Sequence, residues 1–110
     1  LEIDAAALLV AEENRRLNWL WPVCAAGRLS AIDAPAGFDL ALVNVLPERI
    51  ERDLPSVAAL VRPSGRASFS GILIEARDDV SARLARSGFA PSADRSSGEW
   101  CALVTTRRAG

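Results

Sequence analysis

The distribution of apolar and polar residues singles out one stretch, residues 37–46, which reads Gly-Phe-Asp-Leu-Ala-Leu-Val-Asn-Val-Leu. From Phe38 to Val43 this stretch carries apolar residues on both faces, which is typical of a strand in a parallel sheet with helices on both sides. Asn44 stands at the end of this predicted central strand. Because ligands of open α/β sheets bind at the carboxyl ends of strands, Asn44 is the first candidate functional residue. The alternative is that Asn44 only ends the strand and turns the chain, as asparagine often does.

Three further segments space their apolar residues as amphipathic helices do, namely residues 5–17, 47–60 and 75–87. Pro55 lies inside the second segment, and we predict that it divides this segment into two shorter helical pieces. Val80 and Leu84 should face the core from the third segment. Gly88 stands where a left-handed C-cap of that helix is expected.

Shorter apolar stretches predict the remaining strands: the end of a strand at residues 1–3, a short strand leading to Cys24, a buried strand at 66–73, and two strands at 89–95 and 99–106. Residues 62–65 (Arg-Pro-Ser-Gly) form a turn before the buried strand, and Gly71 within it leaves room for a close backbone approach. The short gap at residues 96–98 makes the last two strands an antiparallel hairpin. The order β-α-β-β-α-β-α-β-β predicts a single α/β layer fold with no domain boundary inside residues 1–110.

The amino-acid composition excludes several classes of function. All 13 basic residues are arginine and these 110 residues contain no histidine, which excludes histidine-based acid–base chemistry and a histidine-ligated metal site. The net charge is -1 and the arginines are dispersed among acids, so there is no basic stripe of the kind that binds nucleic acid. No apolar run approaches the ~20 residues that cross a bilayer. We therefore expect a cytoplasmic protein without direct nucleic-acid or membrane partners, in which Cys24 and Cys101 are small buried hydrophobic residues.

Four blocks of residues resemble one enzyme family. The blocks are Glu2-Ile-Asp4 with Ala7-Leu8 and Glu13-Asn14, Phe38-Asp-Leu to Asn44-Val-Leu46, Arg62-Pro-Ser-Gly-Arg66 to Ser70-Gly-Ile-Leu73, and Gly98-Glu-Trp100 with Leu103-Val104. With the element order, they resemble the C-terminal two-thirds of a class I S-adenosylmethionine-dependent methyltransferase domain, and specifically the ribosomal-protein methyltransferases of the PrmA type. The resemblance implies a Rossmann-like α/β sheet with helices on both faces and a C-terminal antiparallel hairpin.

The resemblance also implies a cofactor, S-adenosyl-L-methionine, a protein substrate of the ribosomal-protein type that is N-methylated, and a set of site residues. Glu2 matches the acid that accepts hydrogen bonds from both ribose hydroxyls of the cofactor, which suits the two oxygens of a carboxylate. Arg28 and Leu29 match the segment beside the adenine, although Arg28 stands where Asp is usual and a guanidinium can only donate. Asn44 matches the catalytic residue beside the methyl donor, where its amide oxygen would orient a substrate amine.

A glycine-rich cofactor loop is also part of that superfamily, but the seven glycines of these residues form no Gly-x-Gly cluster. We expect the loop upstream of Leu1, so that residues 1–110 are a partial methyltransferase domain without its first, central strand. Strands ending near Glu2 and Asn44 would then have unpaired edges through which the chain could self-associate. Two other functions stay open: a non-catalytic methyltransferase-like interaction module, which Arg28 favours, and a Rossmann-like nucleotide-binding protein, which the missing phosphate fingerprint disfavours.

Overall fold

The computed structural model describes residues 5–19, 32, 34–44 and 47–109. The chain forms two compact units, residues 1–33 and residues 34–110. The strands expected at residues 1–3 and before Cys24 lie outside the described residues.

The first unit contains helix α1 (Ala5–Leu17), in agreement with the predicted segment. Its alanine-rich sequence has a high intrinsic preference for helix. On its surface Arg15 forms an ion pair with Glu12 at 2.8 Å. The helix is followed by Asn18, whose side-chain amide donates a 2.8 Å hydrogen bond to the carbonyl of Asn14. This bond gives a partner to one of the carbonyls that a helix end leaves without an intrahelical donor.

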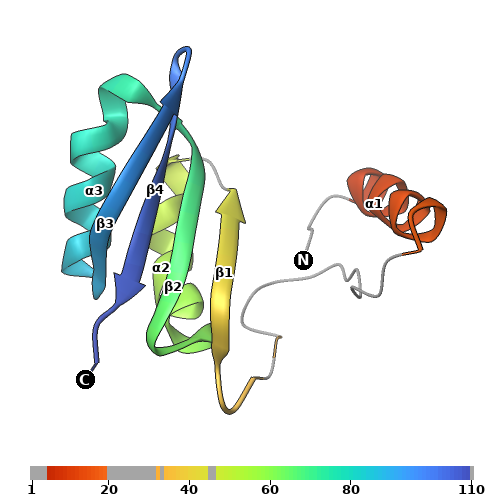
Figure 1. Ribbon diagram of the computed structural model, residues 1–110, viewed down its shortest axis with the longest axis horizontal. Coiled ribbons are helices and arrows are strands. Elements are labelled where there is room, and N and C mark those ends of the chain that lie inside the picture. The colour runs from red at the N-terminus through yellow and green to blue at the C-terminus, as the bar shows by residue number, and fades with distance from the viewer. Residues whose placement is uncertain (1–4, 20–31, 33, 45–46, 110) are drawn as a thin grey trace. The chain divides into compact units, whose positions relative to one another are not determined.

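The second unit is built on a four-stranded mixed sheet (Figure 1). Its strands are β1 (Phe38–Asn44), β2 (Val61–Leu73), β3 (Phe89–Ser97) and β4 (Trp100–Arg107), arranged in the order β1-β2-β4-β3. β1 and β2 are parallel, whereas β4 is antiparallel to both of its neighbours. β3 and β4 form the predicted hairpin, with Gly98 at a φ of 60° in its turn. β1 and β3 therefore lie at the two edges of the described sheet.

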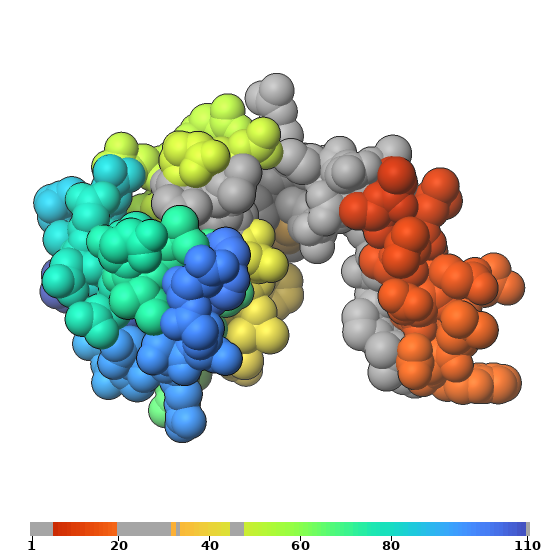
Figure 2. Space-filling view, turned by 90° about the horizontal axis from the view of Figure 1, so that it is seen from above, coloured from red at the N-terminus to blue at the C-terminus, as the bar shows by residue number. Residues whose placement is uncertain are grey.

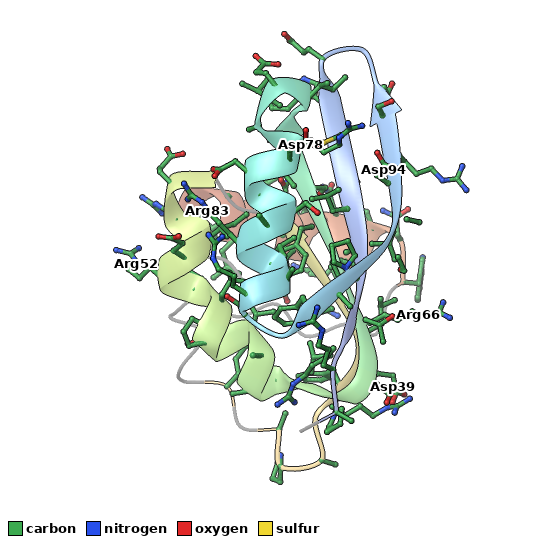
Figure 3. The ribbon with its side chains drawn as sticks, turned by 90° about the vertical axis from the view of Figure 1, so that its left-hand side faces the viewer. Asp39, Arg52, Arg66, Asp78, Arg83 and Asp94 are labelled. Atoms are coloured by element: carbon green, nitrogen blue, oxygen red, sulfur yellow. The ribbon has the colours of Figure 1, made fainter. Side chains whose placement is uncertain are left out.

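Helices cover one face of this sheet (Figure 3). They are α2 (Pro47–Leu60), the short 3-10 helix η2 (Ile74–Ala76) and α3 (Arg77–Arg86). The core between helices and sheet is made by Ile50, Leu54, Val57, Ala67, Phe69, Ile72, Val80, Leu84, Phe89 and Leu103. Phe69 and Phe89 meet edge to face, with ring centroids 5.5 Å apart. The inward positions of Val80 and Leu84 and the left-handed Gly88, with a φ of 92°, are as predicted.

The prediction that Pro55 divides the second helix is wrong. α2 runs as one helix from Pro47 to Leu60 with Pro55 inside it. Pro55 is exposed, whereas Leu54 and Val57 on the other side of the helix are buried. Each buried aliphatic side chain contributes roughly 1.5 to 3 kcal/mol, so packing on the sheet offsets the backbone hydrogen bond that proline cannot make.

The predicted turn at residues 62–65 is a bulge inside β2, not a link between two elements. The register with β1 at this point is Phe38 with Val61, followed by Leu40 with Arg66. β2 thus advances five positions where β1 advances two, and the extra residues loop outward. Ser64 within the bulge has a φ of 66°, in the left-handed region that glycine adopts more easily.

The prediction of a strand that starts at Phe38 and ends at Asn44 is confirmed, but its burial on both faces is not. Phe38, Leu40 and Leu42 are 49%, 56% and 79% exposed. They point to the face of the sheet opposite α2 and α3, whereas Ala41 and Val43 point to the helices and are partly buried. In the described sheet β1 is an edge strand covered on one face, and this is why its alternate leucines reach solvent.

Candidate functional site

Asn44 is the last residue of β1 and stands beside Ser70 of β2 in the parallel register. Because the two strands run in the same direction, their carboxyl ends meet at one end of the sheet. The side chain of Asn44 is exposed there. The structure therefore places an accessible amide where the ligands of open α/β sheets bind.

The amide of Asn44 lies directly on the backbone of Gly71. A Cβ atom added to Gly71 would come within 3.0 Å of Asn44 Oδ1, closer than real Cβ atoms pack. Gly71 has a φ of 76° and lies at an irregularity of β2, where the register with β4 shifts between Phe69 and Ile72. A close approach does occur at Gly71, but the group that comes close is a side chain and not the backbone that the sequence led us to expect. A glycine inside a strand pattern signals such an approach, but the pattern cannot say that Asn44 is the group that comes close.

The β3–β4 hairpin reaches the same end of the sheet. Leu73 pairs with Trp100, and the N–H of Ile74 donates a 2.9 Å hydrogen bond to the carbonyl of Glu99. In Figure 2 the blue turn of the hairpin lies beside the green residues that follow β2. Trp100 is half exposed. Three of the blocks singled out in the sequence, those containing Asn44, Leu73 and Trp100, therefore meet at the carboxyl ends of β1 and β2.

A groove of about 410 Å³ lies between α3 and β3, at the other edge of the sheet. Arg77 lines it and pairs with Asp78 at 3.4 Å and with Asp94 at 3.1 Å; both carboxylates are labelled in Figure 3. These two charges, that of Asp78 more than that of Asp94, raise the pKa of Arg77. The charged side chain of Arg77 in this groove is therefore already paired with carboxylates. The groove lies on the helix-covered face of the sheet and is separate from Asn44.

Cys101 is buried in β4, as predicted. Burial raises the pKa of its thiol, and the nearby Arg77 opposes this only in part. The thiol is therefore protonated at neutral pH and is a poor nucleophile. Among the described residues of the two units, no three metal-binding side chains gather, and no helix is long and apolar enough to span a membrane.

Asn44 is the one predicted site residue that the structure describes. Glu2, Arg28 and Leu29 lie outside the described residues, and so does Cys24. The contacts expected for Glu2 with the cofactor ribose, and for Arg28 and Leu29 with its adenine, stay predictions.

Two parallel strands followed by a hairpin, with the last strand between β2 and β3, define the C-terminal part of a class I methyltransferase sheet. The structure is similar to the crystal structure of ribosomal protein L11 methylase from Lactobacillus delbrueckii subsp. bulgaricus, with a TM-score of 0.83 and 27% identity, over 98% of this chain and 56% of that chain. A putative methyltransferase from Thermoplasma acidophilum shares the fold, with a TM-score of 0.76 and 12% identity over 99% of this chain and 56% of that chain. The predicted α/β class, with a methyltransferase-like sheet and a C-terminal antiparallel hairpin, is confirmed. In the described residues helices cover only one face of the sheet, so the expected cover of the second face stays a prediction.

Sequence comparison identifies the family of this chain. The profile of the family described as ribosomal protein L11 methyltransferase (PrmA) matches residues 1–108, so the chain belongs to this family. Ribosomal protein L11 methyltransferase of Geobacter sulfurreducens is 38% identical over 94% of this chain and 34% of the relative. The Thermus thermophilus protein of the same name is 32% identical over 97% of this chain and 42% of the relative. The chain spans roughly a third to two-fifths of the length of these curated relatives, and the family predicted from the four blocks is confirmed.

Proposed function

We propose that the full-length protein is an S-adenosyl-L-methionine-dependent methyltransferase that N-methylates a ribosomal protein, as the names of its relatives imply. The match of residues 1–108 to the L11 methyltransferase family carries this proposal. The exposed amide of Asn44 at the carboxyl ends of β1 and β2 supports it, because this is where such a sheet holds its ligands. A cytoplasmic location and a protein partner are part of the same proposal.

The exposed amide of Asn44 at the carboxyl ends of β1 and β2 is compatible with a cofactor bound at this end of the sheet. S-adenosyl-L-methionine supplies an activated methyl group on a sulfonium. Asn44 would lie beside that group, and its amide oxygen would accept a hydrogen bond from the substrate amine. Glu2 would accept hydrogen bonds from the ribose hydroxyls, and Arg28 and Leu29 would line the adenine side.

In a methyl transfer of this kind the main task of the protein is to position the two reactants. A neutral amine has to be held in line with the methyl group at close range, and holding reactants in a reactive geometry can supply roughly 7 to 11 kcal/mol of the barrier. An uncharged, oriented amide such as that of Asn44 is suited to this task. The absence of histidine from the chain is compatible with such a reaction.

The test is direct transfer of a labelled methyl group. Purified full-length protein would be incubated with radiolabelled S-adenosylmethionine and purified ribosomal protein L11. We expect label on L11 in proportion to enzyme and time. If the protein bound the cofactor but transferred no label to L11, the methyltransferase assignment would stand and the assignment of L11 as substrate would be refuted. If it neither bound the cofactor nor transferred label, the whole proposal would be refuted.

A non-catalytic methyltransferase-like module is the second candidate. Arg28 favours it, because it replaces the acid expected beside the adenine amino group by a side chain that cannot accept a hydrogen bond. Calorimetric titration with S-adenosylmethionine separates the two, since an enzyme must bind the cofactor and the module need not. An Arg28→Asp variant that gained cofactor binding absent from the wild type would favour the module.

A further inference from the structure

We propose that Gly71 is a positioning residue, whose missing side chain allows the amide of Asn44 to lie on the backbone of β2 in its working orientation. This inference rests on the proposed function, because it assigns Gly71 a part in methyl transfer that it performs through Asn44. Gly71 itself touches no reacting atom in this assignment.

Space is the first reason. A Cβ atom on Gly71 would meet Asn44 Oδ1 within 3.0 Å, and the Cγ atom of Asn44 lies 3.6 Å from the same point. The amide thus occupies the volume that any other residue at position 71 would fill. A side chain there and the present orientation of Asn44 exclude one another.

The second reason is that the side chain of Asn44, and not the backbone of β2, would move to make room for a Cβ atom at position 71. Phe69 and Ile72 on either side of the bulge are 1% and 0% exposed, so the core holds the backbone of β2 in place. Asn44 Oδ1 is the far end of an exposed, flexible side chain. A Cβ at position 71 would therefore turn the amide of Asn44 away and leave the fold nearly intact.

The other described glycines show that this arrangement is particular to Gly71. A Cβ at Gly37 or Gly65 would meet the backbone of Arg62 at 2.7 and 2.8 Å, so those two positions serve the chain fold around the β2 bulge. Gly88 and Gly98 have positive φ values and would meet nothing within 4 Å. Only at Gly71, among these five, would the added atom strike a candidate site side chain.

The experiment uses Gly71→Ala with Gly88→Ala as its matched control in the full-length protein. Both glycines have positive φ, 76° and 92°, so both alanines carry similar backbone strain and should lower the melting temperature by similar amounts, a few degrees. Gly71→Ala alone should shift the side-chain amide resonances of Asn44, which selective ¹⁵N-asparagine labelling and the Asn44→Ala variant identify. It should also lower kcat for methyl transfer to L11 by ~10-fold or more, with KM for S-adenosylmethionine within about threefold.

A double-mutant cycle decides whether Gly71 acts through Asn44. In the Asn44→Ala background, Gly71→Ala should lower kcat by less than about twofold, because the side chain that it displaces is gone. The proposal would be overturned if the side-chain amide resonances of Asn44 did not shift in Gly71→Ala. It would also be overturned if the fold-reductions in kcat caused by the two substitutions multiplied in the double variant. A wild-type protein without transfer activity would refute the proposed function, and the amide resonances would still decide whether Gly71 sets the position of Asn44.

Discussion

At the scale of single residues, Asn44 is the position where sequence and structure agree most closely. Asparagine at a strand end is common in turns, and the sequence allowed that interpretation. In the structure Asn44 still belongs to the ladder with Ser70, and its amide rests on Gly71. The amide occupies the space beside Gly71 without a hydrogen bond to another described residue that fixes it, so a role of Asn44 in positioning a substrate stays a prediction.

Replacing Asn44 by alanine should separate binding from turnover. We expect Asn44→Ala to leave cofactor affinity within a few fold and to lower turnover by ~10²-fold or more, since only positioning is lost. Radiolabel transfer to L11 measures turnover, and titration calorimetry measures affinity. Asn18→Ala, another exposed asparagine, serves as the control and should keep full activity. Turnover near that of the wild type in Asn44→Ala would leave Asn44 as a turn residue.

Replacing Glu2 tests the cofactor side of the site. Loss of two charge-assisted hydrogen bonds to the ribose should remove roughly 2 to 4 kcal/mol of affinity for S-adenosylmethionine in Glu2→Ala, with little change in fold stability. Titration calorimetry gives the dissociation constant. Glu51→Ala, which removes an exposed acid 3.6 Å from Arg83, is the control and should bind as the wild type does. An unchanged constant in Glu2→Ala would refute the ribose assignment.

At the scale of elements, α2 shows that burial can override a local helix breaker. Pro55 lacks the N–H for an intrahelical bond, yet the buried side of the helix, with Ile50 and Leu54, keeps it continuous. The helix therefore retains an unfavourable residue on its solvent side. Such a site is open to stabilisation.

Pro55→Ala should stabilise the full-length protein by about 1 to 3 kcal/mol. Alanine restores the missing N–H and has the highest helix propensity, while the larger unfolded-state entropy of alanine opposes only part of the gain. Urea unfolding followed by circular dichroism gives the free energy of unfolding, and the slope with denaturant should not change. A lower free energy of unfolding would mean that the fold depends on the shape of the proline.

The β2 bulge offers a second site for stabilisation. Ser64 has a φ of 66°, which costs a residue with a Cβ roughly 1 to 2 kcal/mol and costs glycine almost nothing. After the entropy that glycine loses on folding, Ser64→Gly should raise the free energy of unfolding by about 0.5 to 1 kcal/mol. Ser56→Gly, inside α2, is the opposite control and should lower it by a similar amount. If both variants lowered the free energy of unfolding equally, the left-handed conformation of Ser64 would be contradicted.

At the scale of the whole molecule, the exposed edge strand β1 bears on how these 110 residues behave alone. Phe38, Leu40 and Leu42 are exposed on it, and in the described sheet only β2 pairs with it. Unpaired strand edges are sites of association. Association through this edge would pair its free backbone groups and remove its exposed apolar side chains from water.

We therefore expect the isolated 110 residues to self-associate or to be partly molten, and to bind S-adenosylmethionine weakly or not at all. Sedimentation velocity and scanning calorimetry on the purified chain measure both properties. Leu42→Lys places a charge on the edge strand and should reduce the association, whereas Leu9→Lys on α1 should not. A monomeric wild-type chain with sharp two-state melting and micromolar cofactor binding would contradict this expectation.

Local patterns in the sequence were sufficient for α1, α3, the hairpin and the strand that ends at Asn44. The spacing of apolar residues and the glycines at positions 88 and 98 determine these elements, because both act over a few residues. The family likewise follows from the sequence, since its four blocks are short and ordered along the chain. Glu2, Arg28 and Leu29 remain predictions made at that level.

Only the tertiary structure decided the continuity of α2 through Pro55, the bulge that places Ser64 at positive φ, and the contact between Asn44 and Gly71. Each depends on packing between segments that are distant in the sequence, where the burial of one strand or helix outweighs a local preference of another. The sequence by itself determined that Asn44 ends a strand and that Gly71 permits a close approach. That the two meet is a consequence of the parallel register of β1 with β2, which no local pattern encodes.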